Sequence, residues 1–171
     1  MGVCGGYQML GRKLRDPRHV ESRVPEVAGL DLLDMEVEFT PEKKTVQSSG
    51  LVECEEGWLR ELNGLILDGY EIHAGENEFG KDCIPWLKIG QHVDGVCNAD
   101  GNVLGSYLHG LFDDGQFFQA LAHKARGEAS VPGSVTMTMD EFREREFDRI
   151  ANIVRSSVDM KRIYDIIHGE V

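Results

Sequence analysis

The sequence predicts an α/β fold, in which helices pack on a β-sheet. Three observations lead to this prediction: a glycine-rich segment at residues 2–6 that runs into a helical pattern, strand-like stretches through the first two-thirds of the chain, and helical periodicity towards its end. The 171 residues suffice for one domain with a hydrophobic core. No internal repeat, low-complexity tract or interdomain linker is visible, so we expect a single domain over residues 1–171.

The segment Gly2-Val3-Cys4-Gly5-Gly6 has the form of a nucleophile elbow, a sharp strand-to-helix turn that carries a nucleophile. Glycines on both sides of Cys4 let the chain turn back tightly while the cysteine takes a strained backbone conformation. The sulfur would stand at the N-terminus of the next helix, whose dipole favours the thiolate. The Gly5 N–H would face the oxyanion of a tetrahedral intermediate. On these residues alone, a glycine-rich turn with an inert cysteine is an open alternative.

The remaining elements follow in chain order. A helix is expected from Tyr7 to about Leu14, ended by Asp16-Pro17, and a surface loop from Arg18 to Val27. Strands are expected at residues 30–39, 45–54, 64–73 (ending in His73), 86–96 (one or two strands) and, after the turn signal at 100–102, 103–108. Helices are expected at residues 116–126, from an N-cap at Thr138 or Asp140 to residue 158, and around 163–167, with a loop at 127–134.

Among the six histidines, His109 is the best partner for a cysteine nucleophile. It closes an apolar strand and is followed by Gly110, and α/β folds gather their active sites at the carboxyl ends of strands. A base in this place takes the thiol proton and later protonates the leaving amine. The other isolated histidines are expected to be surface or structural residues: His19, His92, His123 and His168.

The segment Tyr70-Glu71-Ile72-His73 has two interpretations. A metal site lacks a third and fourth ligand at suitable spacing, so a structural or interface role is the better prediction. A zinc site built from Cys83, His92 and Cys97 is a further alternative, although these cysteines and Cys54 are most simply core thiols. No phosphate-binding Gly-x-x-x-x-Gly-Lys-Ser/Thr loop occurs, so we expect neither a metal nor a nucleotide cofactor in this domain.

Charge and composition limit the partners. A formal net charge of −12 and an isoelectric point near 4.9 argue against nucleic acid and against an anionic membrane. No stretch approaches the roughly 20 apolar residues of a membrane helix, and no signal peptide opens the sequence. The four cysteines are widely spaced without a Cys-x-x-Cys pair, which predicts the reducing cytoplasm.

The segment Gly2-Val3-Cys4-Gly5-Gly6-Tyr7-Gln8-Met9-Leu10-Gly11 resembles the nucleophile segment of class I (triad-type) glutamine amidotransferases. More narrowly, it is similar to the C-terminal glutaminase domain of the cobyric acid synthases. Further similar stretches follow in the same order at residues 29–36, 69–73, 101–113 and 143–151. The Tyr-Glu-Ile-His segment favours these enzymes over their relatives that amidate two carboxylates earlier in the same pathway. The resemblance implies a three-layer, flavodoxin-like sheet.

The resemblance also implies site roles. Cys4 is the expected nucleophile, His109 the general base and acid, and the Gly5 N–H an oxyanion donor. In other triad glutaminases a glutamate two positions after the histidine orients its ring, but that position is Leu111 in this sequence. Cobyric acid synthases characteristically lack this carboxylate, so a main-chain carbonyl, water or distant acid must orient the ring. Glu71 is a candidate only through its place in the motif.

The implied reaction releases ammonia from glutamine. A synthase domain of the same polypeptide would use the ammonia, with ATP and Mg²⁺, to amidate the corrinoid adenosylcobyrinic acid a,c-diamide to cobyric acid. In the family, this domain, further strands and a loop with a second oxyanion donor precede the elbow, whereas here only Met1, Gly2 and Val3 do. We therefore expect an N-terminally truncated fragment with little activity, and an exposed sheet edge that favours a homodimer.

Two other functions stay open at this point. The first is a non-catalytic interaction domain, in which the elbow survives only as structure. The second is another cysteine hydrolase of the same fold, such as a peptidase or a glutaminase that serves a different synthase.

Overall fold

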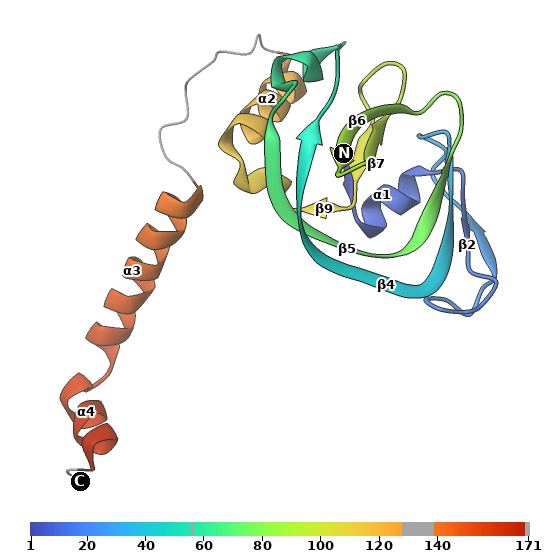
Figure 1. Ribbon diagram of the computed structural model, residues 1–171. Coiled ribbons are helices and arrows are strands. Elements are labelled where there is room, and N and C mark those ends of the chain that lie inside the picture. Colours follow the sequence, from blue (N-terminus) through green and yellow to red (C-terminus); the bar gives the residue numbers. More distant parts are fainter. Residues whose placement is uncertain (56, 128–138, 170–171) are drawn as a thin grey trace. The chain divides into compact units, whose positions relative to one another are not determined.

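A computed structural model describes residues 1–55, 57–127 and 139–169 (Figure 1). Within these residues nine strands form one sheet: β1 (Gly2–Val3), β2 (Lys13–Arg15), β3 (Glu26–Ala28), β4 (Met35–Val52), β5 (Ile66–Phe79), β6 (Ile84–Ile89), β7 (His92–Cys97), β8 (Leu104–Ser106) and β9 (Leu108–His109). The helical elements are α1 (Gly5–Leu10), the 3-10 helices η1 (Trp58–Leu62) and η2 (Leu111–Asp113), α2 (Gly115–Arg126), α3 (Met139–Ser157) and α4 (Met160–His168).

The chain divides into two compact units, residues 1–132 and 133–171, and each is described by itself. The first unit contains the sheet, and the second contains α3 and α4. The single domain expected from the sequence stays a prediction. None of the described helices is both long and apolar enough to cross a membrane.

The sheet is mixed, with the strand order β1-β8-β7-β6-β4-β2-β3. The pairs β1–β8 and β2–β4 are parallel, and the other pairs are antiparallel. Off this path, β5 pairs with β4 and also with the short strand β9. This topology brings the beginning of the chain against β8, while β9, which follows β8 after a single residue, lies against β5.

The longest ladder joins β4 and β5, which run side by side as a curved antiparallel ribbon (Figure 1). The sequence predicted two strands at 30–39 and 45–54, and this was wrong: β4 is one strand of 18 residues that begins at Met35. Its register against β5 shifts between Glu38 and Lys43, around Pro41, so the proline interrupts the ladder without ending the strand. The prediction that the next strand ends at His73 was also wrong, because β5 continues to Phe79 against the first half of β4.

Two hydrophobic clusters cover opposite faces of the sheet. Consecutive residues of β7 divide between them, Val96 in one cluster and Cys97 in the other, as the alternation of a strand requires. The helix α1 packs into the cluster of Val96 through Tyr7, and α2 packs into the other through Phe117. The predicted three-layer arrangement of helix, sheet and helix is therefore confirmed.

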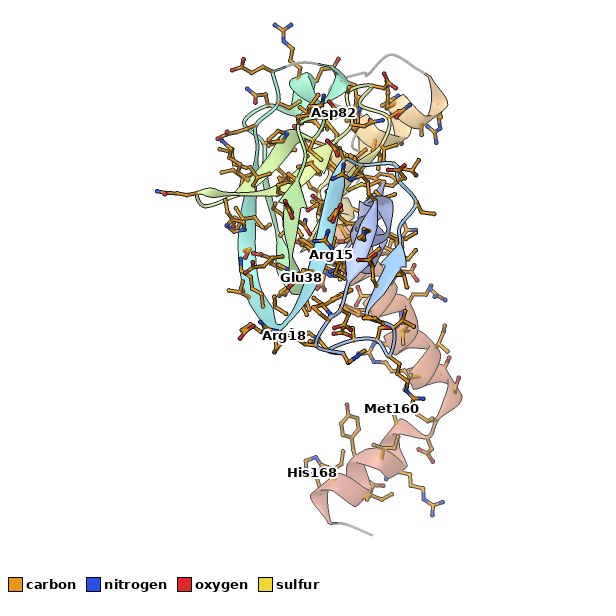
Figure 2. The ribbon with its side chains drawn as sticks, turned by 90° about the vertical axis from the view of Figure 1, so that its right-hand side faces the viewer. Arg15, Arg18, Glu38, Asp82, Met160 and His168 are labelled. Carbon is orange, nitrogen blue, oxygen red and sulfur yellow. The ribbon has the colours of Figure 1, made fainter. Side chains whose placement is uncertain are left out.

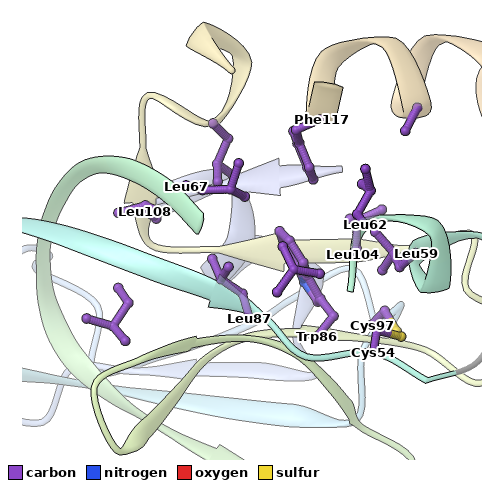
Figure 3. Packing of buried hydrophobic residues seen from close by; sticks show 14 residues of the cluster. Cys54, Leu59, Leu62, Leu67, Trp86, Leu87, Cys97, Leu104, Leu108 and Phe117 are labelled. Atoms are coloured by element: carbon purple, nitrogen blue, oxygen red, sulfur yellow. The ribbon is translucent and has the colours of Figure 1, made fainter. Parts of the chain in front are cut away.

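The larger cluster is built around Trp86 of β6, which is fully buried (Figure 3). Its ring stacks on Phe117 with centroids 5.6 Å apart, and its indole N–H donates to the carbonyl of Gly105 at 3.2 Å. The helix α2 begins where predicted, because the Asp114 carboxylate accepts the N–H of Phe117 at 2.8 Å and so caps its first turn.

The helix after the elbow is shorter than predicted. It ends at Leu10 rather than near Leu14, because Gly11 is extended and residues 13–15 form β2 between β3 and β4. The expected loop up to Val27 already enters β3 at Glu26. In Figure 2 Arg15 of β2 and Glu38 of β4 are labelled, and these residues are partners in the parallel ladder.

The other predicted elements agree with the structure except at one junction. The stretch 86–96 forms the hairpin of β6 and β7, whereas the strand expected at 103–108 is divided into β8 and β9 at Tyr107. The last helix is α4, from Met160 to His168 (Figure 2), and Asp159 caps it by accepting the N–H of Arg162. Asp140 lies inside the first turn of α3 and is no N-cap. Thr138 and all but Gly127 of the expected loop at 127–134 lie outside the described residues.

Candidate active site

Cys4 lies at the junction of β1 and α1, with φ 53° and ψ −121°. This positive φ is rare for a residue with a side chain, and it is the strained conformation that a nucleophile elbow requires. The Cys4 N–H donates to the Ser106 carbonyl at 3.0 Å, while the Cys4 carbonyl accepts the N–H of Gln8 at 3.1 Å. The elbow is thus fixed on one side by β8 and on the other by its own helix.

The thiol of Cys4 points to β5, where it donates to the Ile72 carbonyl at 3.2 Å. The thiol is partly exposed. Gly5 follows as the first residue of α1 and is exposed, and a Cβ added there would meet nothing within 4 Å. Its N–H belongs to the first turn, where helix N–H groups have no partner within the helix.

His109 lies in β9 and is the ladder partner of Tyr70 in β5. Its Nε2 is buried and has no hydrogen-bond partner among the residues that the structure describes. The close approach of β9 depends on Gly69, since a Cβ at that position would lie 1.8 Å from the His109 carbonyl oxygen.

The structure therefore brings both predicted side chains to one stretch of β5. Cys4 bonds to Ile72 and His109 pairs with Tyr70, two residues earlier, a distance of roughly 7 Å along a strand. Within the described parts of the chain, no hydrogen bond joins the thiol directly to the imidazole.

Glu71 faces a different histidine. It is 2% exposed, and its Oε1 lies 2.5 Å from Lys44 Nζ and 3.0 Å from His73 Nε2. Burial raises the pKa of this carboxyl, but the hydrogen bonds from Lys44 and His73 outweigh burial and hold the pKa below its usual value. The contacts of Glu71 therefore give no support to its candidate role in orienting His109.

His73 is held on both nitrogens. Its Nδ1 lies 3.1 Å from the Gly75 carbonyl oxygen, and its Nε2 lies 3.0 Å from Glu71 Oε1. The ring stacks on Tyr107 at 3.9 Å between centroids. These groups line a hollow of about 420 Å³, to which His92 also contributes. The structural or interface role expected of the 70–73 segment stays a prediction, and this packing is compatible with the structural one.

The zinc alternative finds no support in the geometry. Among residues 1–55, 57–127 and 139–169, no three His, Cys, Asp or Glu side chains gather in a way that could hold a metal ion. The Cys83 thiol donates to the Asp34 carbonyl at 3.1 Å, and Cys97 is buried in the larger cluster, where burial raises the pKa of its thiol to about 11.

Sequence reasoning missed a carboxylate behind the elbow. Asp94 of β7 is 3% exposed, and it accepts the hydroxyl of Ser106 and the N–H of Tyr107. The only signal was a single acidic residue inside the otherwise apolar stretch 93–97, which predicts a buried polar group with a specific partner.

A strained cysteine between a strand and a helix, with a histidine against the same neighbouring strand, is typical of α/β proteins with a cysteine nucleophile. Over residues 1–117 the chain matches the CobB/CobQ-like glutamine amidotransferase domain family, and it belongs to that family. The fold is accordingly the class I glutamine amidotransferase-like α/β fold that the sequence predicted.

Several curated relatives are cobyric acid synthases. The protein from Dehalococcoides mccartyi is 39% identical over 175 residues, which cover 98% of this chain and 34% of the relative. The one from Alkaliphilus metalliredigens is 39% identical over 180 residues, covering 99% and 36%, and one from Clostridium botulinum is 40% identical over 174 residues, covering 98% and 34%. The chain thus spans about a third of the length of these relatives.

Proposed function

We propose that this chain is the glutaminase domain of a cobyric acid synthase, and that Cys4 and His109 release ammonia from glutamine. The observation that carries the proposal is the strained Cys4 at the strand-to-helix turn, with its thiol on Ile72 and with His109 paired two residues away on β5. The assignment to cobyric acid synthase is supported by relatives of that name whose sequences align with nearly the whole chain.

In the proposed reaction, the Cys4 thiolate attacks the side-chain amide carbon of glutamine, and the Gly5 N–H donates to the resulting oxyanion. The buried Nε2 of His109, which has no partner in the described structure, takes the thiol proton and passes it to the departing ammonia. Water then cleaves the γ-glutamyl thioester. Glutamine and water become glutamate and ammonia, and the thiol is restored.

We further propose that the ammonia passes to a synthase domain of the same polypeptide. That domain would activate carboxylates of adenosylcobyrinic acid a,c-diamide with ATP and Mg²⁺, and four amidations would give cobyric acid. Direct transfer matters because free ammonia becomes ammonium in neutral water and loses its nucleophilic lone pair. The glutaminase domain itself would need no metal or nucleotide.

The proposed compartment is the cytoplasm, since none of the four cysteines is in a disulfide and their spacing suits reducing surroundings. The outer edge of β1, which pairs only with β8 among the described strands, is the proposed contact for a second copy of the chain. Light scattering over a range of protein concentrations tests this homodimer, and a constant monomer mass would contradict it.

The catalytic proposal is tested with diazo-oxo-norleucine, a glutamine analogue that alkylates glutaminase nucleophiles. We expect one adduct on the peptide that contains Cys4, lost in Cys4→Ala and formed at least 10²-fold more slowly in His109→Asn. The product of the whole gene should be used, so that every group of the site is present. Cys83→Ala is the matched control, because it removes another partly buried thiol and should leave labelling unchanged.

Two outcomes would contradict the proposal. An intact protein that is never labelled would favour the non-catalytic interaction domain. Labelling at Cys4 without glutamine hydrolysis, but with turnover of peptides or other amides, would favour a different cysteine hydrolase of this fold.

A further inference from the structure

The chain changes neighbours abruptly between β8 and β9. Ser106, the last residue of β8, pairs with β1, whereas Leu108, the first residue of β9, pairs with Glu71 of β5. Only Tyr107 lies between them. A strand that leaves one ladder for another within one residue deprives its backbone N–H groups of ladder partners, and such groups are costly to bury without a replacement.

Two side chains replace these partners. The Asp94 carboxylate accepts the N–H of Tyr107 at 3.2 Å, and the Ser106 hydroxyl accepts the N–H of Leu108 at 2.9 Å. The same hydroxyl donates to Asp94, so the two side chains act as one unit. Asp94 is 3% exposed and Ser106 is fully buried. We call these two residues the junction clamp.

The junction clamp lies between the two proposed catalytic groups. On one side, the Ser106 carbonyl accepts the Cys4 N–H at 3.0 Å and so fixes the elbow. On the other side, Leu108 is followed directly by His109. Within the described residues, the hydrogen bonds of Asp94 all go to residues 106 and 107, so its contacts serve this junction.

The use of a carboxylate for this task is energetically expensive. Burial raises the pKa of Asp94, and the hydroxyl of Ser106 lowers it while the nearby charge of Glu71 raises it again. A neutral side chain could hold an ordinary strand junction at a lower desolvation cost. Buried carboxylates with this desolvation cost are typical of sites whose geometry must be maintained for function.

We infer that Asp94 and Ser106 are positioning residues for the glutaminase reaction, and that they hold His109 at its working distance from Cys4. This inference rests on the proposed function. In other triad enzymes a carboxylate orients the histidine through direct contact with the imidazole. Here the junction clamp would position His109 through the backbone that connects it to the elbow.

The test compares Asp94→Asn and Ser106→Ala with the unsubstituted protein, as its whole gene encodes it. Displacing reacting groups by about 1 Å costs on the order of 10²-fold in rate, so we expect kcat for glutamine and the rate of Cys4 labelling to fall 10- to 100-fold with KM nearly constant. The pH profile of Cys4 alkylation by iodoacetamide should change as it does in His109→Asn. Ser106→Thr, which keeps the hydroxyl, should retain most of the activity.

Leu59→Ala is the control for a purely structural role, because it removes a buried core side chain of η1, which is not a strand of the sheet and carries neither clamp residue. Each protein is assayed well below its unfolding midpoint. Clamp variants that label as fast as the unsubstituted protein, or that lose activity only in proportion to stability as Leu59→Ala does, would overturn the inference. An unsubstituted protein that is never labelled would instead overturn the proposed function.

Discussion

Cys4 is a residue whose backbone conformation and chemistry have opposite requirements. The proposed reaction needs a thiol at the end of β1, yet φ 53° with ψ −121° suits a glycine. Strain of this kind costs about 1–3 kcal/mol and persists only where the surrounding structure enforces it. The bond from the Cys4 N–H to Ser106 and the start of α1 at Gly5 supply that enforcement.

This strain leads to the first prediction. Cys4→Gly should be more stable than Cys4→Ala by about 1 kcal/mol, because the relief of strain exceeds the roughly 0.5–1 kcal/mol by which glycine favours the unfolded chain. Both variants lose the thiol and its bond to Ile72, so the comparison isolates the backbone. Urea unfolding followed by circular dichroism measures the difference.

Cys83 provides the matched pair for this measurement. It is partly buried and is not among the residues with positive φ, so Cys83→Gly should be less stable than Cys83→Ala. If glycine were the less stable substitution at both positions, the elbow would carry no strain.

The sequence predicted the strand-to-helix turn at Cys4 and proposed His109 as its partner, because the residues directly beside each one form a recognisable local pattern. The elbow needs small residues on both sides of Cys4, and a histidine that closes an apolar strand followed by Gly110 is conspicuous. The junction clamp could not be predicted in this way. Asp94 and Ser106 are 12 positions apart, and their contact exists only because β7 and β8 pair with a particular register.

At the scale of elements, the main error of the sequence-based prediction was in the extent of the long strands β4 and β5. Local patterns divided β4 at its charged middle, where residues 41–47 are exposed. Period-2 alternation is lost there, since both faces of that part are in contact with solvent. The ladder to β5 continues across the register shift and keeps the strand intact, which is a tertiary effect that no single-strand pattern reveals.

The same ladder contains an unfavourable charge pair that gives the next prediction. Glu38 and Glu76 are direct cross-strand partners, and both are exposed. Like charges in this arrangement repel, so Glu76→Lys should stabilise the protein by about 0.5–1 kcal/mol at low salt. Glu76→Gln removes the repulsion without adding attraction and should give a smaller gain. Urea unfolding measures both, and a lysine variant no more stable than the glutamine variant would contradict the prediction.

At the scale of the whole molecule, acidic side chains exceed basic ones by 30 to 18, which gives the formal net charge of −12. An excess of this size opposes compaction through self-repulsion. The ion pairs that offset it are partly exposed, such as Arg12 with Asp34 and Lys13 with Glu26, and pairs of this kind are each worth at most about 1 kcal/mol. Repulsion therefore dominates the long-range electrostatics of the folded state.

The last prediction follows from this balance. Raising the ionic strength from 0.01 M to 0.15 M shortens the screening length from about 30 Å to about 8 Å, which weakens distant repulsions more than contacts at 3 Å. We expect the thermal midpoint of the protein at neutral pH to rise, by about 2–4 °C for each kcal/mol gained. Calorimetry measures the shift, and sucrose at equal osmolality controls for effects other than screening. A midpoint that falls with salt would mean that the ion pairs, rather than the net charge, decide the electrostatic part of stability.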